Sequence, residues 1–253
     1  MSQIRQSAAD WCYFRGPLDA PTVYRRLRAA GYDAVELVPE PRWPAARAAG
    51  LKLLNIGSPG MQEGLNRVAH HATLLPAIRG LLTKASANGI AQIIVFSGSR
   101  AGQPDAEGIR NCTTALTALA PDAEAAGVTL LLELLNGHDH PDYQCDSGRF
   151  AFAVVRAVGS PRVRALYDIY HAHRMGEDVA ATILENLECI GHLHIAGSPR
   201  RDFPGPQQAI DYRALVQRVT DAGYTGHWGQ EFLGGAEIVA EYERACELFA
   251  TYA

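Results

Sequence analysis

The chain has 253 residues, 47% of them hydrophobic and 20% charged, and its formal net charge at pH 7 is −4. This size and apolar content allow one large hydrophobic core or two small ones, and an acidic balance without a run of Lys or Arg disfavours a nucleic-acid surface. The N-terminus lacks the apolar run of a secretion signal, no stretch reaches the length of a membrane span, and the five cysteines form no Cys-x-x-Cys pair. We therefore expect a soluble cytoplasmic protein with free thiols.

Apolar stretches of strand length alternate with helical stretches through the first half of the chain. Leu18, Val23 and Leu27 recur with helical spacing, and this pattern ends at Gly31. The predicted strands are 4–9, 34–38, 51–56 and 92–96, and the predicted helices are 17–30, 44–49 and 69–88. The stretch 57–64 is rich in Gly and Pro, which predicts an irregular loop at the rim of the fold.

The alternation continues more regularly in the second half. The predicted strands there are 128–133, 163–167, 189–195 and 226–232, and the predicted helices are 105–126, 148–158, 178–186, 212–222 and 237–249. Eight strand-then-helix units without a linker predict a parallel sheet with right-handed crossovers. A doubly wound sheet would need fewer units or more residues in each. We therefore expect an α/β fold with one domain over residues 1–253, a single (β/α)8 TIM barrel.

The fifth to eighth predicted strands each end in a residue that can bind a metal, namely Glu133, Asp168, His194 and Glu231. The C-terminal ends of barrel strands face one mouth, so these side chains are expected to converge there. Three carboxylates and one imidazole suit one divalent metal ion, Mn²⁺, Mg²⁺ or Co²⁺. The alternative for each residue alone is a polar group at the barrel rim. For Asp168 that alternative is a helix cap, with His171 in a solvated loop.

The motifs around these strand ends resemble those of a known family. They read Leu-Glu-Leu-Leu-Asn at 132–136, Tyr-Asp-Ile-Tyr-His at 167–171 with Arg-Met at 174–175, Ile-Gly-His-Leu-His-Ile-Ala at 190–196, and Gln-Glu-Phe at 230–232. From about residue 58 to the end, and most densely over 128–231, the sequence is similar to the hydroxypyruvate isomerase branch of the xylose-isomerase-like sugar isomerases and epimerases.

The resemblance implies a metal-dependent aldose–ketose isomerase that acts on a small sugar or keto-acid. Glu133 and Glu231 would bind the cation and also move protons, while Asp168 and His194 would complete the coordination. Proton transfer between adjacent carbons of an α-hydroxycarbonyl passes through an enediolate, whose charge a chelated divalent ion stabilises. Relatives of this kind are commonly homodimers or homotetramers.

The resemblance also implies a set of substrate contacts. His171 would hydrogen-bond the substrate, Arg200 or Arg201 would hold its polar end, and Asp139 would add an acidic contact. Glu36 ends the second predicted strand, and it is expected either to reach the site or to pair with a loop arginine. Because Arg binds carboxylate and phosphate through a bidentate fork, we expect an anionic substrate. The alternative is that both arginines are solvated and pair with an acid such as the neighbouring aspartate.

The sequence departs from the family pattern at three places, and the last two of them leave the substrate and the reaction open. Leu134 replaces the Pro usual after the fifth-strand Glu, and 208–212 lacks the Glu of the family's Gly-Glu-Ile-Asn-Tyr turn. His194 is the form found in ketose 3-epimerases, whereas the nearest isomerases often carry Gln. The main alternative is therefore a ketose 3-epimerase, which needs two bases on opposite faces of the substrate.

Two further classes remain as alternatives. An endonuclease IV-like nuclease shares the barrel but needs a richer set of histidines and a basic rim, and a non-catalytic sugar-binding protein would keep the pocket alone. Weaker candidates for metal binding, with solvated side chains as the alternative, are His70, His71, His138 and His140. Aromatic candidates for the pocket wall, with plain packing as the alternative, are Trp11, Phe14 and Trp228.

Overall fold

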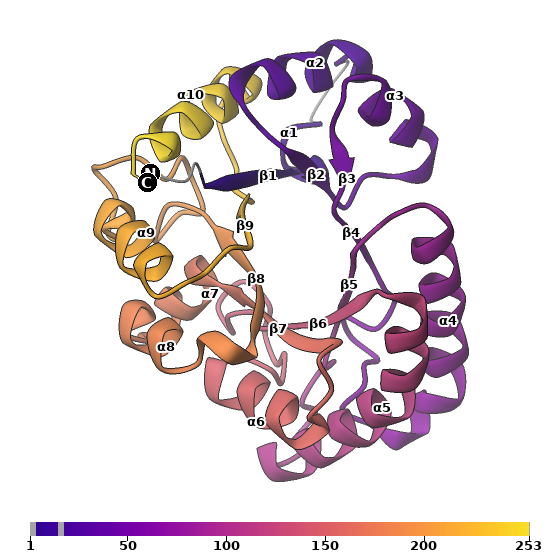
Figure 1. Ribbon diagram of the computed structural model, residues 1–253. Coiled ribbons are helices and arrows are strands. Elements are labelled where there is room, and N and C mark those ends of the chain that lie inside the picture. The colour runs from indigo at the N-terminus through magenta and orange to yellow at the C-terminus, as the bar shows by residue number, and fades with distance from the viewer. Residues whose placement is uncertain (1–3, 15–17, 253) are drawn as a thin grey trace.

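The computed structural model describes residues 4–14 and 18–252. In this part of the chain, nine parallel strands form one sheet in the order β3-β2-β1-β9-β8-β7-β6-β5-β4, and the sheet curls into a barrel ringed by helices (Figure 1). The strands are β1 (Arg5–Ala9), β2 (Ala34–Glu36), β3 (Lys52–Leu53), β4 (Asn55–Gly57), β5 (Gln92–Val95), β6 (Thr129–Glu133), β7 (Val163–Asp168), β8 (Ile190–Ile195) and β9 (His227–Gln230). The predicted TIM-barrel fold is confirmed.

The ninth strand arises because the predicted third strand is divided at Leu54. Its first half, β3, pairs with β2, and its second half, β4, pairs with β5. The amide of Leu54 donates to the carbonyl of Val35 at 2.9 Å, and the amide of Leu37 donates to the carbonyl of Asn55 at 3.3 Å. Backbone hydrogen bonds therefore continue across the point where the two ends of the sheet meet.

The longer helices cover the outside of the strands, and α10 lies beside α2 where the end of the chain meets its beginning (Figure 1). In α2, the side chain of Asp19 accepts a hydrogen bond from the amide of Thr22 at 3.0 Å, and Gly31 ends the helix with φ +113°. The predicted start of this helix, at 17, lies outside the described residues. The helices that were predicted from the sequence are α2 (Ala20–Ala30), α3 (Trp43–Ala48), α4 (Val68–Ala87), α5 (Asp105–Ala126), α6 (Gly148–Val158), α8 (Val179–Glu185), α9 (Tyr212–Asp221) and α10 (Ile238–Ala250).

Two short α-helices that follow strands directly were not predicted, α1 (Asp10–Tyr13) and α7 (Ile169–Arg174). They are too short to show a helical period in the sequence. Two 3-10 helices, η1 (Glu40–Arg42) and η2 (Leu187–Cys189), complete the set. Among the described helices, none has the length and apolarity needed to cross a membrane.

Candidate metal centre

Four side chains from neighbouring strands meet at the C-terminal mouth of the barrel. Glu133, Asp168, His194 and Glu231 are all buried, and one ligand atom of each lies within 4.8 Å of the others. Nδ1 of His194 is 3.2 Å from a carboxylate oxygen of Glu231, 3.6 Å from one of Glu133 and 3.9 Å from one of Asp168. The structure thus brings together the four residues predicted as metal ligands.

Strand pairing explains why these side chains converge. Asp168 of β7 is paired with His194 of β8, and the amide of Glu231 donates to the carbonyl of Ile195 at 3.0 Å, so Glu231 continues the pairing just beyond β9. Parallel strands of a barrel end at one face, which places their last residues around one point.

Asp168 caps a helix and is also positioned for the ligand role considered for it in the sequence. Its Oδ1 accepts a hydrogen bond from the amide of His171 at 2.9 Å and so caps α7, while its Oδ2 faces His194. The alternative of a solvated loop position for His171 is wrong, because its side chain is fully buried.

The four residues fit a divalent cation. In the described part of the chain, Nδ1 of His194 is buried without a hydrogen-bond partner, whereas Nε2 lies 2.9 Å from Glu36. A ring nitrogen without a hydrogen-bond partner and three buried carboxylates together form a donor set for a hard or borderline cation, because unpaired buried charges are costly. In metal-binding histidines, one ring nitrogen usually binds the metal while the other donates a hydrogen bond to a carboxylate or carbonyl. Nε2 of His194 makes such a contact with Glu36.

The two glutamates of the cluster differ in their electrostatic surroundings. Burial, together with the charges of Glu231 and Asp168, raises the pKa of Glu133 to about 7. Burial alone would also raise the pKa of Glu231, but the positive charges of His194 and Arg201 hold it well below its ordinary value. A bound dication would favour the ionised form of both.

A cavity of about 430 Å³ opens beside the cluster, within the size range of small-molecule sites. Glu133 and Glu231 line it, whereas Asp168 and His194 are absent from its described lining. The polar part of the lining also includes Arg201. The rest of the wall is largely apolar or backbone and comprises Trp11, Leu37, Gly57, Ser58, Met61, Ile94, Phe96, Leu135 and His140.

The two candidate arginines are placed very differently. The side chain of Arg200 is 80% exposed and forms an ion pair with Asp202 at 2.8 Å, as the alternative reading of the sequence expected. The side chain of Arg201 is only 11% exposed, lies 2.5 Å from Glu231 and 3.9 Å from Asp168, and lines the cavity. A positive φ of 55° at Arg201 accompanies this turn of the chain toward the site.

His171 lies behind the cluster with one ring nitrogen unengaged. Its Nδ1 accepts a hydrogen bond from the amide of Asn136 at 3.1 Å, and Nε2 is buried 3.7 Å from Asp168 without a hydrogen bond to any described residue. Burial lowers the pKa of His171 to about 4. The ring is therefore neutral near pH 7, with its hydrogen on Nε2.

Two other predicted substrate contacts lie away from the cavity. Asp139 is exposed, and its carboxylate accepts hydrogen bonds from Asn136 at 3.0 Å and from Tyr170 at 2.6 Å. Glu36 is fully buried below the cluster and contacts His194, so its position does not fit a direct contact with substrate or with a loop arginine.

The weaker candidates lie at the cavity, in the core or nearer the surface, where His138 is exposed. His71 contacts the carbonyl of Leu65 at 2.9 Å, and Trp228 packs against Tyr224 in the core. Trp11 does wall the cavity, and its indole nitrogen donates to Glu231 at 2.9 Å.

Sequence reasoning missed the apolar wall of the cavity. Leu37 follows β2, Phe96 follows β5 and Leu135 follows β6 by two residues. Examining the last two residues of every predicted strand, together with the first two residues after it, would have found them, because these positions also face the mouth.

Comparisons with known proteins agree with this geometry. A family model described as Xylose isomerase-like TIM barrel matches residues 24–251. A Mus musculus protein named "Putative hydroxypyruvate isomerase" is 30% identical over 92% of this chain and 90% of its own. A 2-oxo-tetronate isomerase of Cupriavidus necator is 34% identical over 51% of this chain and 50% of its own. A solved structure titled AP endonuclease, family 2, from Brucella melitensis has a TM-score of 0.85 at 21% identity, over 98% of this chain and 99% of that one, and so shares the fold. The chain belongs to the xylose isomerase-like TIM barrel family, a group of sugar isomerases and epimerases.

Proposed function

We propose that the protein is a divalent-metal-dependent isomerase that interconverts the aldose and ketose forms of a short α-hydroxycarbonyl compound, as a hydroxypyruvate isomerase does. The observation that carries the proposal is the double position of Glu133 and Glu231, which belong to the ligand cluster and also line the cavity. The names of the relatives, isomerases of hydroxypyruvate and of 2-oxo-tetronate, support a small hydroxy-keto-acid as substrate.

The residues divide the chemistry between them. Glu133, Asp168, Glu231 and Nδ1 of His194 would hold the cation. When bound, a divalent cation supplies Lewis-acid stabilisation of the negative charge that develops on the two substrate oxygens. Glu133 and Glu231 face the cavity and would take the carbon-bound proton and return it to the neighbouring carbon, a step worth about 10²–10⁴-fold. His171 is not part of the described cavity lining, and its Nε2–H lies 3.7 Å from Asp168, so its contact with a substrate oxygen stays a prediction.

The cavity supports a short, anionic substrate. Arg201 places a guanidinium at its polar side, where it can bind a carboxylate. Among the other lining residues, Leu37, Ile94 and Phe96 offer no side-chain partners to hydroxyl groups. A long polyhydroxylated chain would lose hydrogen bonds to water there without replacing them.

Arg201→Ala is expected to raise KM for a keto-acid substrate roughly ten- to hundredfold, which corresponds to about 1.5–3 kcal/mol for a hydrogen bond to a charged group. Arg200→Ala is the matched control, because that exposed side chain pairs with Asp202 and such surface pairs contribute little. Steady-state kinetics of both variants provides the test. Equal effects of the two substitutions, or faster turnover of neutral ketohexoses than of any keto-acid, would refute the anionic substrate.

Asp168→Asn and His171→Ala are expected to separate metal binding from substrate binding. Asn is as good a helix cap as Asp, so Asp168→Asn should keep α7 and weaken cation affinity roughly tenfold or more, because a neutral amide is a poorer ligand. His171→Ala should leave metal content unchanged and lower kcat/KM. The metal content of both purified variants tests this prediction, and thermal unfolding checks that both are folded. Equal metal loss in the two variants would contradict the separation of metal binding from substrate binding.

A ketose 3-epimerase is the second candidate, because two carboxylates at one cavity could serve as bases on opposite faces of a substrate. Incubating the metal-loaded protein in D₂O with small keto-acids and sugars tests both functions. An isomerase should form the aldose–ketose partner with deuterium incorporated at carbon, whereas an epimerase should form the C3 epimer. Absence of exchange with every compound would favour a non-catalytic sugar-binding protein.

The nuclease alternative gains no support from the Brucella structure, since that likeness concerns the fold.

A further inference from the structure

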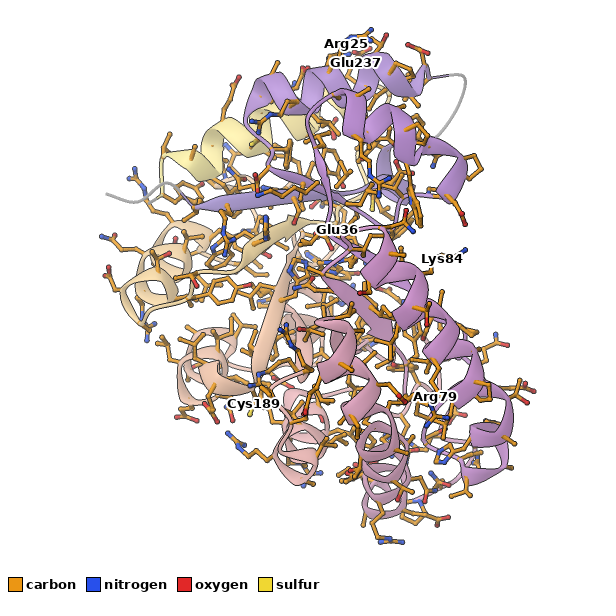
Figure 2. All side chains as sticks on the ribbon, turned by 45° about the vertical axis from the view of Figure 1, so that its right-hand side comes forward. Arg25, Glu36, Arg79, Lys84, Cys189 and Glu237 are labelled. Carbon is orange, nitrogen blue, oxygen red and sulfur yellow. The ribbon has the colours of Figure 1, made fainter. Side chains whose placement is uncertain are left out.

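We propose that Glu36 is a positioning residue of the metal centre, which holds the ring of His194 so that its Nδ1 faces the three carboxylates. This inference rests on the proposed cation site and adds to it a residue that is part of neither the ligand cluster nor the cavity lining. In Figure 2, Glu36 is labelled among the side chains that fill the barrel, whereas Arg25, Arg79 and Glu237 lie at the periphery.

The carboxylate of Glu36 is surrounded by hydrogen-bond donors from three other strands. Oε1 accepts from the hydroxyl of Ser7 at 2.6 Å, and Oε2 accepts from the side-chain amide of Asn55. Nε2 of His192 lies 3.0 Å from both oxygens, and Nε2 of His194 lies 2.9 Å from Oε2. All of these side chains are buried, so the carboxylate and its partners form a closed polar layer below the cluster.

This arrangement determines which nitrogen of His194 carries a hydrogen. An ionised carboxylate can only accept hydrogen bonds, so Nε2 of His194 must be the protonated nitrogen. Nδ1 then points away from Glu36 and toward Glu133 and Glu231, at 3.6 and 3.2 Å. A cation bound there would replace the Nδ1 hydrogen of the charged ring. Carboxylates placed behind metal-binding histidines are known to act in this way.

Gly229 provides the space that this contact needs. A Cβ atom at this position would lie 2.5 Å from Oε1 of Glu36, 2.7 Å from Cδ2 of His194 and 2.8 Å from Nε2 of His192. Each distance is shorter than van der Waals contact. Gly229→Ala should therefore displace the glutamate from the two histidines while leaving every ligand atom in the chain.

The same three residues, Glu36, His192 and His194, could instead be ligands of a second cation. The hydrogen-bond distances and the two additional donors to the carboxylate favour the positioning role. The stoichiometry of binding separates these alternatives, because the positioning role requires one cation per chain.

The test measures Mn²⁺ affinity from the electron paramagnetic resonance signal of the free ion. Glu36→Leu removes all acceptors at similar volume, and we expect its Kd to rise up to roughly a hundredfold. Glu36→Gln retains one acceptor oxygen, and its Kd should rise by a smaller factor of roughly ten. Gly229→Ala should also weaken binding. Ser7→Ala, which removes one buried hydrogen bond from the layer without touching His194, is the control and should bind Mn²⁺ like the wild type.

A second readout reports on the ring itself. In Zn²⁺-loaded protein labelled with ¹⁵N-histidine, long-range ¹H–¹⁵N correlation should show His194 with its hydrogen on Nε2 in the wild type and a changed pattern in Glu36→Gln. If Glu36→Leu fails to fold, the Mn²⁺ affinity of Glu36→Gln and this spectrum still test the positioning role of Glu36.

Three results would overturn the positioning role: unchanged Mn²⁺ affinity in both Glu36 variants, a hydrogen on Nδ1 of His194 in the Zn²⁺-loaded wild type, or two cations per chain. A wild-type chain that binds no divalent cation would instead refute the proposed function, on which the inference rests.

Discussion

Changing either Glu133 or Glu231 to Gln is expected to lower kcat by about 10²–10⁴-fold at saturating Mn²⁺. Gln keeps the size of the side chain and one oxygen ligand but has no basic oxygen, so the cation should still bind, with reduced affinity, while proton transfer stops. Both residues line the cavity. Glu133 is the last residue of β6, and Glu231 directly follows the last residue of β9. Rigid elements therefore hold them against the substrate.

The two variants need not fail in the same way. If one of them still exchanges substrate hydrogen with D₂O while the other does not, the inactive one identifies the base that removes the carbon-bound proton. Glu237→Gln, an exposed residue before α10, is the control for the loss of a carboxylate and should be fully active. Recovery of near wild-type turnover by both site variants once Mn²⁺ is saturating would show that the glutamates act as ligands only.

Removal of divalent cations is expected to abolish turnover, and Mn²⁺, Mg²⁺ or Co²⁺ should restore it. The physical reason is the composition of the site: three carboxylates and one imidazole nitrogen hold a hard or borderline cation, and without it the charge of an enediolate has no Lewis acid to stabilise it. Activity is measured after exhaustive dialysis against a chelator and again after adding each ion. Circular dichroism of the dialysed protein shows whether the fold persists.

Full turnover by exhaustively chelated, folded protein would refute the metal-dependent mechanism. Restoration by Zn²⁺ alone would keep the mechanism but correct the predicted preference for Mn²⁺, Mg²⁺ or Co²⁺. The predicted homodimer or homotetramer and the cytoplasmic location stay predictions.

Much of the fold and the ligand cluster could be predicted from the sequence, because both depend on strand boundaries. Apolar runs locate strands, and residues just after them in a parallel barrel must face one mouth. This is why Glu133, Asp168, His194 and Glu231 could be grouped from the sequence although they lie far apart in it. The division of the third strand at Leu54 was missed, because nothing in the apolar run marks the change of pairing partner.

Depth within the barrel could not be predicted in this way. Glu36 also ends a strand, but its side chain lies in the layer below the cluster, where donors from β1, β4 and β8 surround it. Likewise, Arg200 and Arg201 are adjacent in the sequence, and only the local backbone turns Arg201 inward and leaves Arg200 paired with Asp202 at the surface. Such differences depend on packing between distant segments, which strand periodicity does not contain.

Anomalous diffraction from crystals grown with Mn²⁺ tests the central claim most directly. The account predicts one Mn²⁺ peak per chain at the barrel mouth, within about 2.5 Å of its oxygen ligands, bound by carboxylate oxygens of Glu133, Asp168 and Glu231 and by Nδ1 of His194. A peak elsewhere in the chain, coordination through Nε2 of His194, or no peak at saturating Mn²⁺ would contradict it.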